Sequence, residues 1–455
     1  MKKHWLCLTA LLILCSLSFY SSVSAAKGSI DPVKCRVELD RNVLPVGDSQ
    51  NVVVKVTLDA ERPEVKLNRP KVNLSIVLDR SGSMSGEKIE KAKEAAIEAL
   101  RRLGPDDICS VVIYDHNIET IIPAQSAGNI EWIESRIKSI RPGGNTALFG
   151  GVSQGASEIR KNLYGGFVNR IILLSDGIAN VGPSSPEELG RLGAALLKED
   201  IAVTTIGVGT DYNEDLMARL SQNSDGNTYF VESSRDLPRI FQAELGDVLD
   251  VVAKKVRVVI ECPDNIKPVR IIGRDGRIMG QTIELSLNQL YGGQEKYALV
   301  EVTVPEGRDG QDMEIAKAEV SYINSYTQKS GASGGKVMAR FSDDIKVVEK
   351  STNVGVKKDL YLNFNALAEE KAISLSDEGK EADAAAVLKG SAEQIRAFAV
   401  QYDDKEMLDK AKAMEQQAEI IEEEGMSNKQ RKYLRSKSYQ MKNQQSVSST
   451  ESDEQ

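Results

Sequence analysis

Oxygen-bearing side chains lie in three glycine-containing segments of this 455-residue chain. The segments read Leu-Asp-Arg-Ser-Gly-Ser-Met-Ser-Gly, Arg-Pro-Gly-Gly-Asn-Thr-Ala and Leu-Leu-Ser-Asp-Gly. The side chains suited to hold one metal ion together are those of Asp79, Ser81, Ser83, Thr146 and Asp176. Hard divalent cations take oxygen ligands of this kind, usually with few carboxylates and several waters. The residue types therefore indicate a site for Mg²⁺ or Mn²⁺.

Strands and helices are predicted to position these segments. Between about residues 71 and 254, short apolar runs alternate with amphipathic stretches, which is typical of a mainly parallel sheet with crossover helices. The predicted strands are 72–78, 108–114, 170–174, 201–208 and 228–231. The predicted helices are 89–103, 130–140, 147–163, 186–198, 214–220 and 239–254. Because Asp79 and Asp176 follow two of these strands, we expect them at the carboxyl edge of the sheet, where open α/β sheets bind ligands.

The region from about residue 70 to 250 resembles the von Willebrand factor type A domain. The metal-ion-dependent adhesion site (MIDAS) of that family has the pattern Asp-x-Ser-x-Ser, then Thr, then Asp, and all five positions are filled here in that order. The resemblance implies direct ligation of the metal by Ser81 and Ser83, and by Thr146 in the ligand-engaged state. It also implies that Asp79 and Asp176 bind the metal directly or through water, and that the fold is Rossmann-like and doubly wound.

Binding without catalysis is the function that this site predicts. Each of the five residue types is also common in turns and at helix N-caps, so any one of them alone would favour a cap. Together they leave a cation electrophilic, with an open position that a partner's Asp or Glu can fill. We expect a metal-dependent protein-binding or adhesion module whose partner is a protein or matrix ligand presenting an acidic residue. The alternative is a periplasmic assembly factor or scaffold that acts mainly through its C-terminal helices.

Catalytic patterns in the chain lack the context that their chemistry needs. The segment 151–155 matches the G-x-S-x-G pattern of α/β-hydrolases, but it falls inside a predicted helix instead of at a strand-to-helix turn. The two histidines are His4 and His116, and His116 falls in a predicted hairpin turn. So few histidines with scattered cysteines form no zinc motif. We therefore expect that the protein is not an enzyme.

Alternating β patterns flank the α/β region on both sides. They cover 36–39 and 52–58 before it, and 256–261, 281–285, 296–304, 314–322 and 336–341 after it. Two strands are too few to bury a face alone, so we infer that both flanks build one β-sandwich into which the α/β region is inserted. These segments also resemble secreted bacterial members of the family that embed the domain in a β-sandwich. The predicted units are a β segment 26–69, the α/β domain 70–254, a second β segment 255–350, a helical region 357–426 and a disordered tail 427–455.

The first 25 residues are typical of a signal peptide. Two lysines precede an apolar run, and Val23-Ser24-Ala25 matches the pattern that signal peptidase recognises. We expect a secreted or periplasmic protein with no integral membrane span after cleavage. Cleavage leaves Cys35, Cys109 and Cys262; Cys109 is predicted to be a buried hydrophobe, and the sequence leaves open whether Cys35 and Cys262 form a disulfide.

The composition, with 41% hydrophobic and 27% charged residues, is that of an ordinary globular protein. The chain carries 58 Lys and Arg against 67 Asp and Glu, a formal net charge of −9. Bulk electrostatic attraction to nucleic acid is therefore not expected. An acidic partner would have to be held by something local, and the predicted cation provides that attraction.

Overall fold

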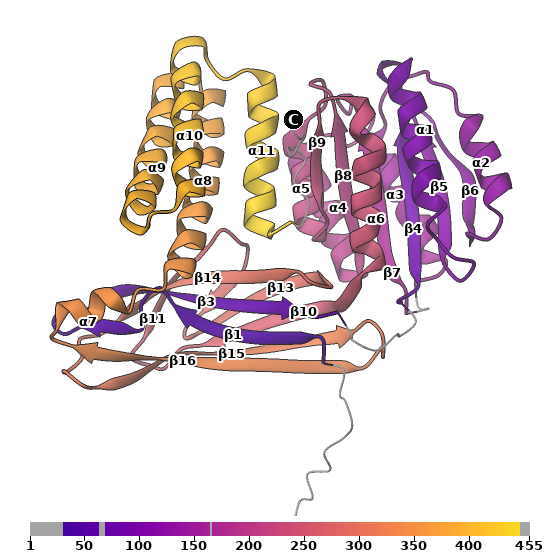
Figure 1. Cartoon of the computed structure of the whole chain (residues 1–455). Helices are drawn as coiled ribbons and strands as arrows, with labels where there is room; N and C mark the ends of the chain where they lie inside the picture. The colour runs from indigo at the N-terminus through magenta and orange to yellow at the C-terminus, as the bar shows by residue number, and fades with distance from the viewer. Residues whose placement is uncertain (1–30, 63–68, 164–165, 446–455) are drawn as a thin grey trace, which may run out of the picture. The chain divides into compact units, whose positions relative to one another are not determined.

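A six-stranded sheet forms the centre of the α/β region in the computed structural model, which describes residues 31–62, 69–163 and 166–445. Its strands lie in the order β6 (Ile118–Ser126), β5 (Ile108–Tyr114), β4 (Val72–Asp79), β7 (Val168–Ser175), β8 (Ile201–Val208) and β9 (Thr228–Val231) (Figure 1). β6 is antiparallel to β5, and the other neighbouring pairs are parallel. The five predicted strands are present, and the hairpin predicted at His116 adds β6 as a sixth.

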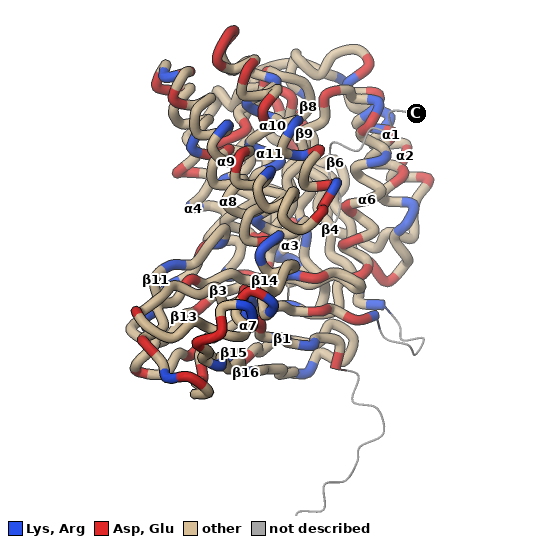
Figure 2. The backbone as a smooth tube through the Cα atoms, turned by 60° about the vertical axis from the view of Figure 1, so that its left-hand side comes forward, with Lys and Arg blue, Asp and Glu red and all other residues tan. Residues whose placement is uncertain are grey.

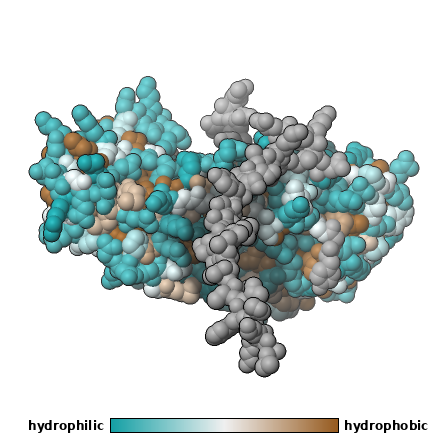
Figure 3. All heavy atoms as spheres, turned by 90° about the horizontal axis from the view of Figure 1, so that it is seen from below, coloured by the Kyte–Doolittle hydropathy of each residue, from teal (hydrophilic) through white to brown (hydrophobic). Residues whose placement is uncertain are grey.

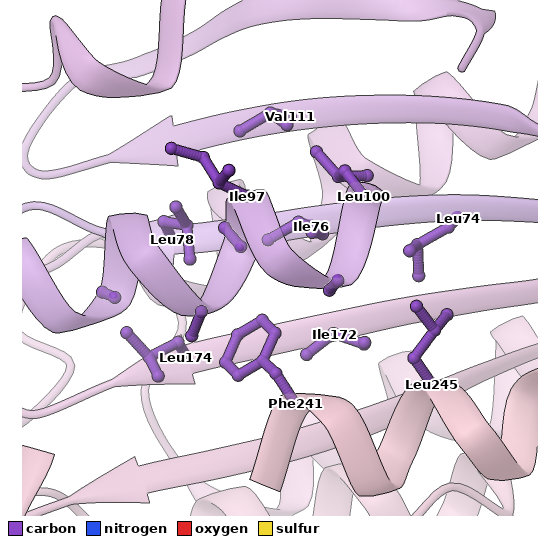
Figure 4. Packing of buried hydrophobic residues seen from close by; sticks show 14 of the residues in the cluster. Leu74, Ile76, Leu78, Ile97, Leu100, Val111, Ile172, Leu174, Phe241 and Leu245 are labelled. Carbon is purple, nitrogen blue, oxygen red and sulfur yellow. The ribbon is translucent and has the colours of Figure 1, made fainter. Parts of the chain in front are cut away.

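Helices pack on both faces of this sheet. They are α1 (Glu87–Leu100), α2 (Ile130–Lys138), α3 (Leu148–Arg160), α4 (Pro186–Lys198), α5 (Glu214–Ser224) and α6 (Leu237–Leu249). Leu74, Ile76 and Leu78 of β4 belong to the hydrophobic cluster that contains Phe241 of α6 (Figure 4), whereas Val77 belongs to the cluster on the opposite face. A parallel sheet that is covered on both sides explains why its strands read as continuous apolar runs. The carboxyl ends of the strands remain free to carry polar loops.

The predicted helix 239–254 is too long. α6 ends at Leu249, and the strand β10 (Val251–Glu261) begins two residues later. β10 pairs with one strand on each side, and its β-branched Val251 and Val252 suit a sheet better than a helix. Pairing with distant strands therefore overrides the helical spacing at the end of this segment.

Two further sheets combine strands from before and after the α/β region. One has the order β1 (Val33–Leu39), β3 (Gln50–Ala60), β14 (Glu295–Val304), β11 (Lys267–Ile272). The other has the order β12 (Arg277–Met279), β13 (Thr282–Tyr291), β10, β15 (Asp312–Asn324), β16 (Ser330–Ser342), β2 (Val43–Pro45). Buried residues of both sheets, such as Val54 and Val258, belong to one hydrophobic cluster. The predicted fold class, a doubly wound α/β unit inserted between paired β segments, is confirmed.

The C-terminal part is helical, as predicted, but it extends further than predicted. It comprises α7 (Ile345–Lys350), α8 (Val354–Asp377), α9 (Glu381–Tyr402), α10 (Lys405–Glu424) and α11 (Asn428–Asn443). The prediction of a disordered tail from residue 427 is wrong for α11, which starts with a capping box formed by Ser427 and Gln430. Residues 446–455 of that tail lie outside the described residues.

The basic residues of α11 contact acidic residues of other elements. Within the compact unit that begins at Pro32, α11 packs against α5, α8 and β9. Arg431 forms ion pairs with Glu214 and Asp215 of α5 and with Asp377 of α8. These partners are far away in sequence, so the spacing within the helix could not reveal them.

The three cysteines of the described residues are free thiols. Cys35 lies in β1, whereas Cys262 follows β10 in the other flanking sheet, so the disulfide left open by the sequence is not formed. Cys109 is buried in β5, and burial raises the pKa of its thiol to about 12. It is therefore the small buried hydrophobe that was predicted.

The surface of the described residues is mixed in character. On the face shown in Figure 3, hydrophobic residues form small areas among hydrophilic ones. Among residues 31–62, 69–163 and 166–445, no helix is both long and apolar enough to cross a membrane. The predicted signal peptide lies outside the described residues.

Candidate metal centre

The candidate donors lie on three neighbouring loops at one edge of the sheet. Asp79 is the last residue of β4, and Ser81 and Ser83 follow in the loop that leads to α1. Asp176 comes directly after β7, which pairs in parallel with β4, so both strands end at the same edge. Thr146 precedes α3. The predicted order of elements is therefore the one that brings these loops together.

Hydrogen bonds connect four of the five donors. The Ser81 and Ser83 hydroxyl oxygens are 3.0 Å apart, and the Ser83 hydroxyl donates to Oδ1 of Asp176 at 2.8 Å. Asp79 accepts from the backbone N–H of Ser81 at Oδ1 and from the hydroxyl of Ser175 at Oδ2, both at 2.8 Å. The two carboxylates are thus oriented by this chain's own groups before any ligand binds.

The surroundings of Gly177 show that the Thr146 hydroxyl lies near the hydroxyls of Ser81 and Ser83. A Cβ atom at Gly177 would lie 3.3 Å from Ser83 Oγ, 3.4 Å from Thr146 Oγ1 and 4.0 Å from Ser81 Oγ. Three hydroxyls from two loops therefore converge on the side-chain-free face of a glycine in the third loop. The structure brings all five predicted residues together.

Backbone contacts hold the loops against one another. Gly143 N donates to Arg80 O at 2.7 Å, and Gly82 N donates to Gly144 O at 3.1 Å. Gly144 has φ = +82° and lies against His116, where a Cβ would come within 2.2 Å of the imidazole. A residue with a side chain would be strained there and would also clash with His116. These contacts fix the first two loops relative to each other.

The third loop is fixed to Thr146 through Asn180. The backbone N–H of Thr146 donates to Asn180 Oδ1 at 2.9 Å, and the backbone N–H of Asn180 donates to Thr146 O at 3.1 Å. Asn180 was not among the site residues predicted from the sequence. Its position four residues after Asp176 was the available signal, since Asn commonly bonds backbone groups in loops.

The electrostatics of the site are dominated by burial of its two carboxylates. Asp79 and Asp176 are both 0% exposed. Burial raises the pKa of Asp79 to about 6, with a further contribution from the negative charge of Asp176, although the hydrogen bonds from Ser81 and Ser175 act in the opposite direction. The Nζ atom of Lys88 lies 2.6 Å from Asp176 Oδ2. Lys88 was also absent from the predicted site residues; its place in the first turn of α1, directly after the site loop, was the available signal.

The donor set fits a hard divalent cation. Two carboxylates and three hydroxyls are all oxygen ligands, which suits Mg²⁺ or Mn²⁺. Within the described part of the chain, no group of three or more His, Cys, Asp or Glu residues could hold a metal, so such a site has to rely on hydroxyls. None of the five candidate donors is the N-cap of an α-helix here: the N-caps of α1 and α3 are Gly86 and Ala147. Ser81 stands at the N-cap of the short 3-10 helix Gly82–Met84 but makes no side-chain cap bond. Their side chains therefore do not cap the α-helices that follow, although Asp79 makes a turn-type bond to the backbone N–H of Ser81.

The G-x-S-x-G segment lies where it was predicted to lie. Ser153 is inside α3, and its hydroxyl donates to Phe149 O at 2.8 Å. It is not on the strand-to-helix turn that exposes a hydrolase nucleophile. His116 lies in the turn between β5 and β6.

Comparison with known sequences identifies the α/β region. The family model described as "von Willebrand factor type A domain" matches residues 73–243. An uncharacterized protein of Synechocystis sp. is 26% identical over 261 residues, 55% of this chain and 61% of its own length. An uncharacterized protein of Escherichia coli is 27% identical, covering 50% of this chain and 40% of its own length. An inter-alpha-trypsin inhibitor heavy chain of Rattus norvegicus is 22% identical, covering 55% and 30%. The chain thus spans from about a third to three fifths of the length of these relatives.

Comparison with solved structures extends the likeness beyond that region. The von Willebrand factor type A protein from Catenulispora acidiphila has a TM-score of 0.67 and 17% identity, covering 85% of this chain and 90% of its own. The ArnB paralog VWA2 from Sulfolobus acidocaldarius has a TM-score of 0.63 and 18% identity, covering 92% and 100%. At these identities the likeness concerns the fold. Together with the family match, it establishes that this chain contains a von Willebrand factor type A domain.

Proposed function

We propose that the chain is a non-enzymatic module that binds a partner protein or matrix ligand through a divalent cation held at a MIDAS. The observation that carries this proposal is the convergence of the Ser81, Ser83 and Thr146 hydroxyls on Gly177, next to the buried carboxylates of Asp79 and Asp176. Mg²⁺ or Mn²⁺ would be held by these five side chains and would supply a Lewis-acidic position open to the solvent. A carboxylate from an Asp or Glu of the partner would complete the coordination.

Charge supports this assignment. The chain has a net charge of −9, so an acidic partner gains no general attraction from it. Figure 2 shows acidic and basic residues interspersed over the elements in view. A bound divalent cation would attract an acidic partner despite the negative net charge of the chain, because its field is strong over a few ångströms in a partly buried site. Since three of the five donors are neutral, much of the charge of the cation stays available to the partner.

The site residues themselves are suited to binding. The hydroxyls of Ser81 and Ser83 are oriented by each other and by Asp176. Preorganised donors reduce the cost of ordering that a ligand must overcome. We also propose, from the N-terminal sequence, that residues 1–25 are removed on export and that binding takes place outside the cytoplasm.

The experiment is a metal titration combined with a pull-down. Isothermal titration with Mg²⁺ or Mn²⁺ alone measures the cation site in the wild type, in Asp79→Ala and in Asp106→Ala; Asp106 is a matched control because its side chain is 79% exposed. Partner capture is then compared with and without EDTA. We expect Asp79→Ala and EDTA to abolish both signals and Asp106→Ala to change neither. Partner binding that persists in Asp79→Ala or in EDTA would overturn the proposal.

A further inference from the structure

One ammonium group lies at the candidate metal centre. Lys88 is the second residue of α1, and its Nζ atom is 2.6 Å from Oδ2 of Asp176, which is fully buried. The other oxygen of that carboxylate accepts the hydroxyl of Ser83 at 2.8 Å. Both oxygens of Asp176 are therefore engaged by groups of this chain. The positive charge of Lys88 therefore neutralises Asp176, one of the two carboxylates of the site.

The charge of Lys88 acts mainly on the candidate metal centre, because its ion-pair partner is Asp176. Among the residues that the structure describes, Asp176 is the carboxylate that lies within 4.0 Å of this ammonium. Gly209 is also close, since a Cβ there would be 3.8 Å from Nζ. The side chain is 31% exposed, so water screens its charge only in part.

The position of Lys88 is unfavourable for the helix. Cations in the first turn of a helix are repelled by the positive end of its dipole, typically by about 0.3–1 kcal/mol. The neighbouring first-turn residues Glu87 and Glu90 have the favourable sign. Helix formation alone therefore does not explain a lysine at this position.

We propose that Lys88 sets the charge of the metal centre, weakening cation binding while strengthening capture of the partner's carboxylate; this inference rests on the proposed function. Asp79, Asp176 and Lys88 together carry one negative charge, so a bound dication leaves the centre with one positive charge. Without Lys88, the same cation would meet two negative charges and the centre would be neutral. A cation would then bind more tightly, but an incoming carboxylate would be attracted less.

The two opposite effects separate this role from a purely structural one. If Lys88 only anchored α1 or oriented Asp176, its removal would weaken cation binding and carboxylate binding together. If it sets the charge, the two affinities move in opposite directions.

The test uses the full chain with Mn²⁺ as the metal and acetate as the carboxylate probe. Mn²⁺ affinity is measured by calorimetry, and acetate binding to the Mn²⁺ protein by the loss of water-proton relaxation as bound water is displaced. The variants are Lys88→Gln, Lys88→Met as a second neutral form, and Lys88→Arg, which keeps the charge. The control is Lys91→Gln, which removes a lysine that pairs with Glu94 on the same helix.

We expect both neutral variants to bind Mn²⁺ about tenfold more tightly, and to need several times more acetate for half-displacement, as one unit charge over a few ångströms implies in a partly screened site. Lys88→Arg and Lys91→Gln should behave as the wild type. Equal or weaker Mn²⁺ binding by the neutral variants overturns the inference and leaves the proposed function standing. Absence of Mn²⁺ binding in the wild type itself overturns the proposed function and this inference with it.

Discussion

Replacing Gly177 by alanine would place a methyl group among the hydroxyls of the candidate metal centre. The new Cβ would be 3.3 Å from Ser83 Oγ and 3.4 Å from Thr146 Oγ1. Mg²⁺ needs oxygen ligands at about 2.1 Å in a nearly ideal octahedron, so a methyl this close to two of its donors excludes a water or a partner oxygen from the sphere. We expect the Kd for Mg²⁺ to rise at least about tenfold, which corresponds to about 1.4 kcal/mol.

The same substitution should affect folding little. Gly177 is not among the glycines with positive φ, and no backbone atom of another segment is among its nearest neighbours within 4 Å. Glycine-to-alanine changes at compatible positions stabilise by about 0.4–1 kcal/mol through the unfolded state, which offsets the tight contacts with the two hydroxyls. The free energy of unfolding should therefore change by less than about 1 kcal/mol.

Calorimetric titration with Mg²⁺, together with thermal denaturation in EDTA, separates these two effects. The matched control is Gly143→Ala, in the second site loop, because a Cβ there would meet no atom within 4 Å. It should leave Mg²⁺ affinity unchanged and raise Tm slightly, because no contact offsets the lower entropy of the unfolded chain. Wild-type Mg²⁺ affinity in Gly177→Ala would show that the hydroxyls do not surround the cation, and the assignment of the site would have to be abandoned.

Three further predictions concern the site and helix α11. The double variant Ser81→Ala/Ser83→Ala should keep the far-ultraviolet circular dichroism of the wild type, because site residues on a rigid edge contribute little to the core. It should lose the rise in Tm that we expect from millimolar Mg²⁺. Global unfolding of this variant would contradict the prediction. Burial raises the pKa of Asp79 to about 6, above the unfolded value of 3.8, so the metal-free protein loses stability as pH rises through this window, and protons compete with the cation below it. The Mg²⁺-induced rise in Tm should therefore be larger at about pH 7.5 than at about pH 5, and an equal rise at both would count against Asp79 as a ligand. Arg431→Ala should lower the free energy of unfolding by about 1–2 kcal/mol in chemical denaturation, since Asp377 loses its arginine while Glu214 and Asp215 keep only Lys432 and Arg435. The exposed Lys429→Ala should change it by less than about 0.5 kcal/mol.

The strands of the α/β region could be predicted because burial on both faces leaves a local signal. The segments 108–114, 201–208 and 228–231 were predicted with the bounds that the structure has. The pattern Asp-x-Ser-x-Ser directly after a strand also placed its side chains at the carboxyl edge, since a parallel sheet has its ligand-binding loops there. These inferences need only the residue types within short continuous segments of the sequence.

The contacts between residues inside the candidate site could not be predicted from the sequence. Gly177, Asn180 and Lys88 act through contacts with residues that lie far away along the chain, namely the hydroxyls of Ser81 and Ser83, the backbone of Thr146 and the carboxylate of Asp176. The place of Lys88 directly after the site loop was a local signal, but it did not show that the ammonium reaches Asp176.

The amino-acid sequence alone indicated five candidate oxygen donors and the strand-and-helix pattern that presents them. Both follow from residue types and short-range periodicity. The folded chain was needed to show that β4 lies beside β7, that Lys88 pairs with Asp176, and that α11 is an ordered helix and not a tail. These features depend on pairings between distant segments, and their energy comes from burial and charge contacts that exist only once the chain has folded.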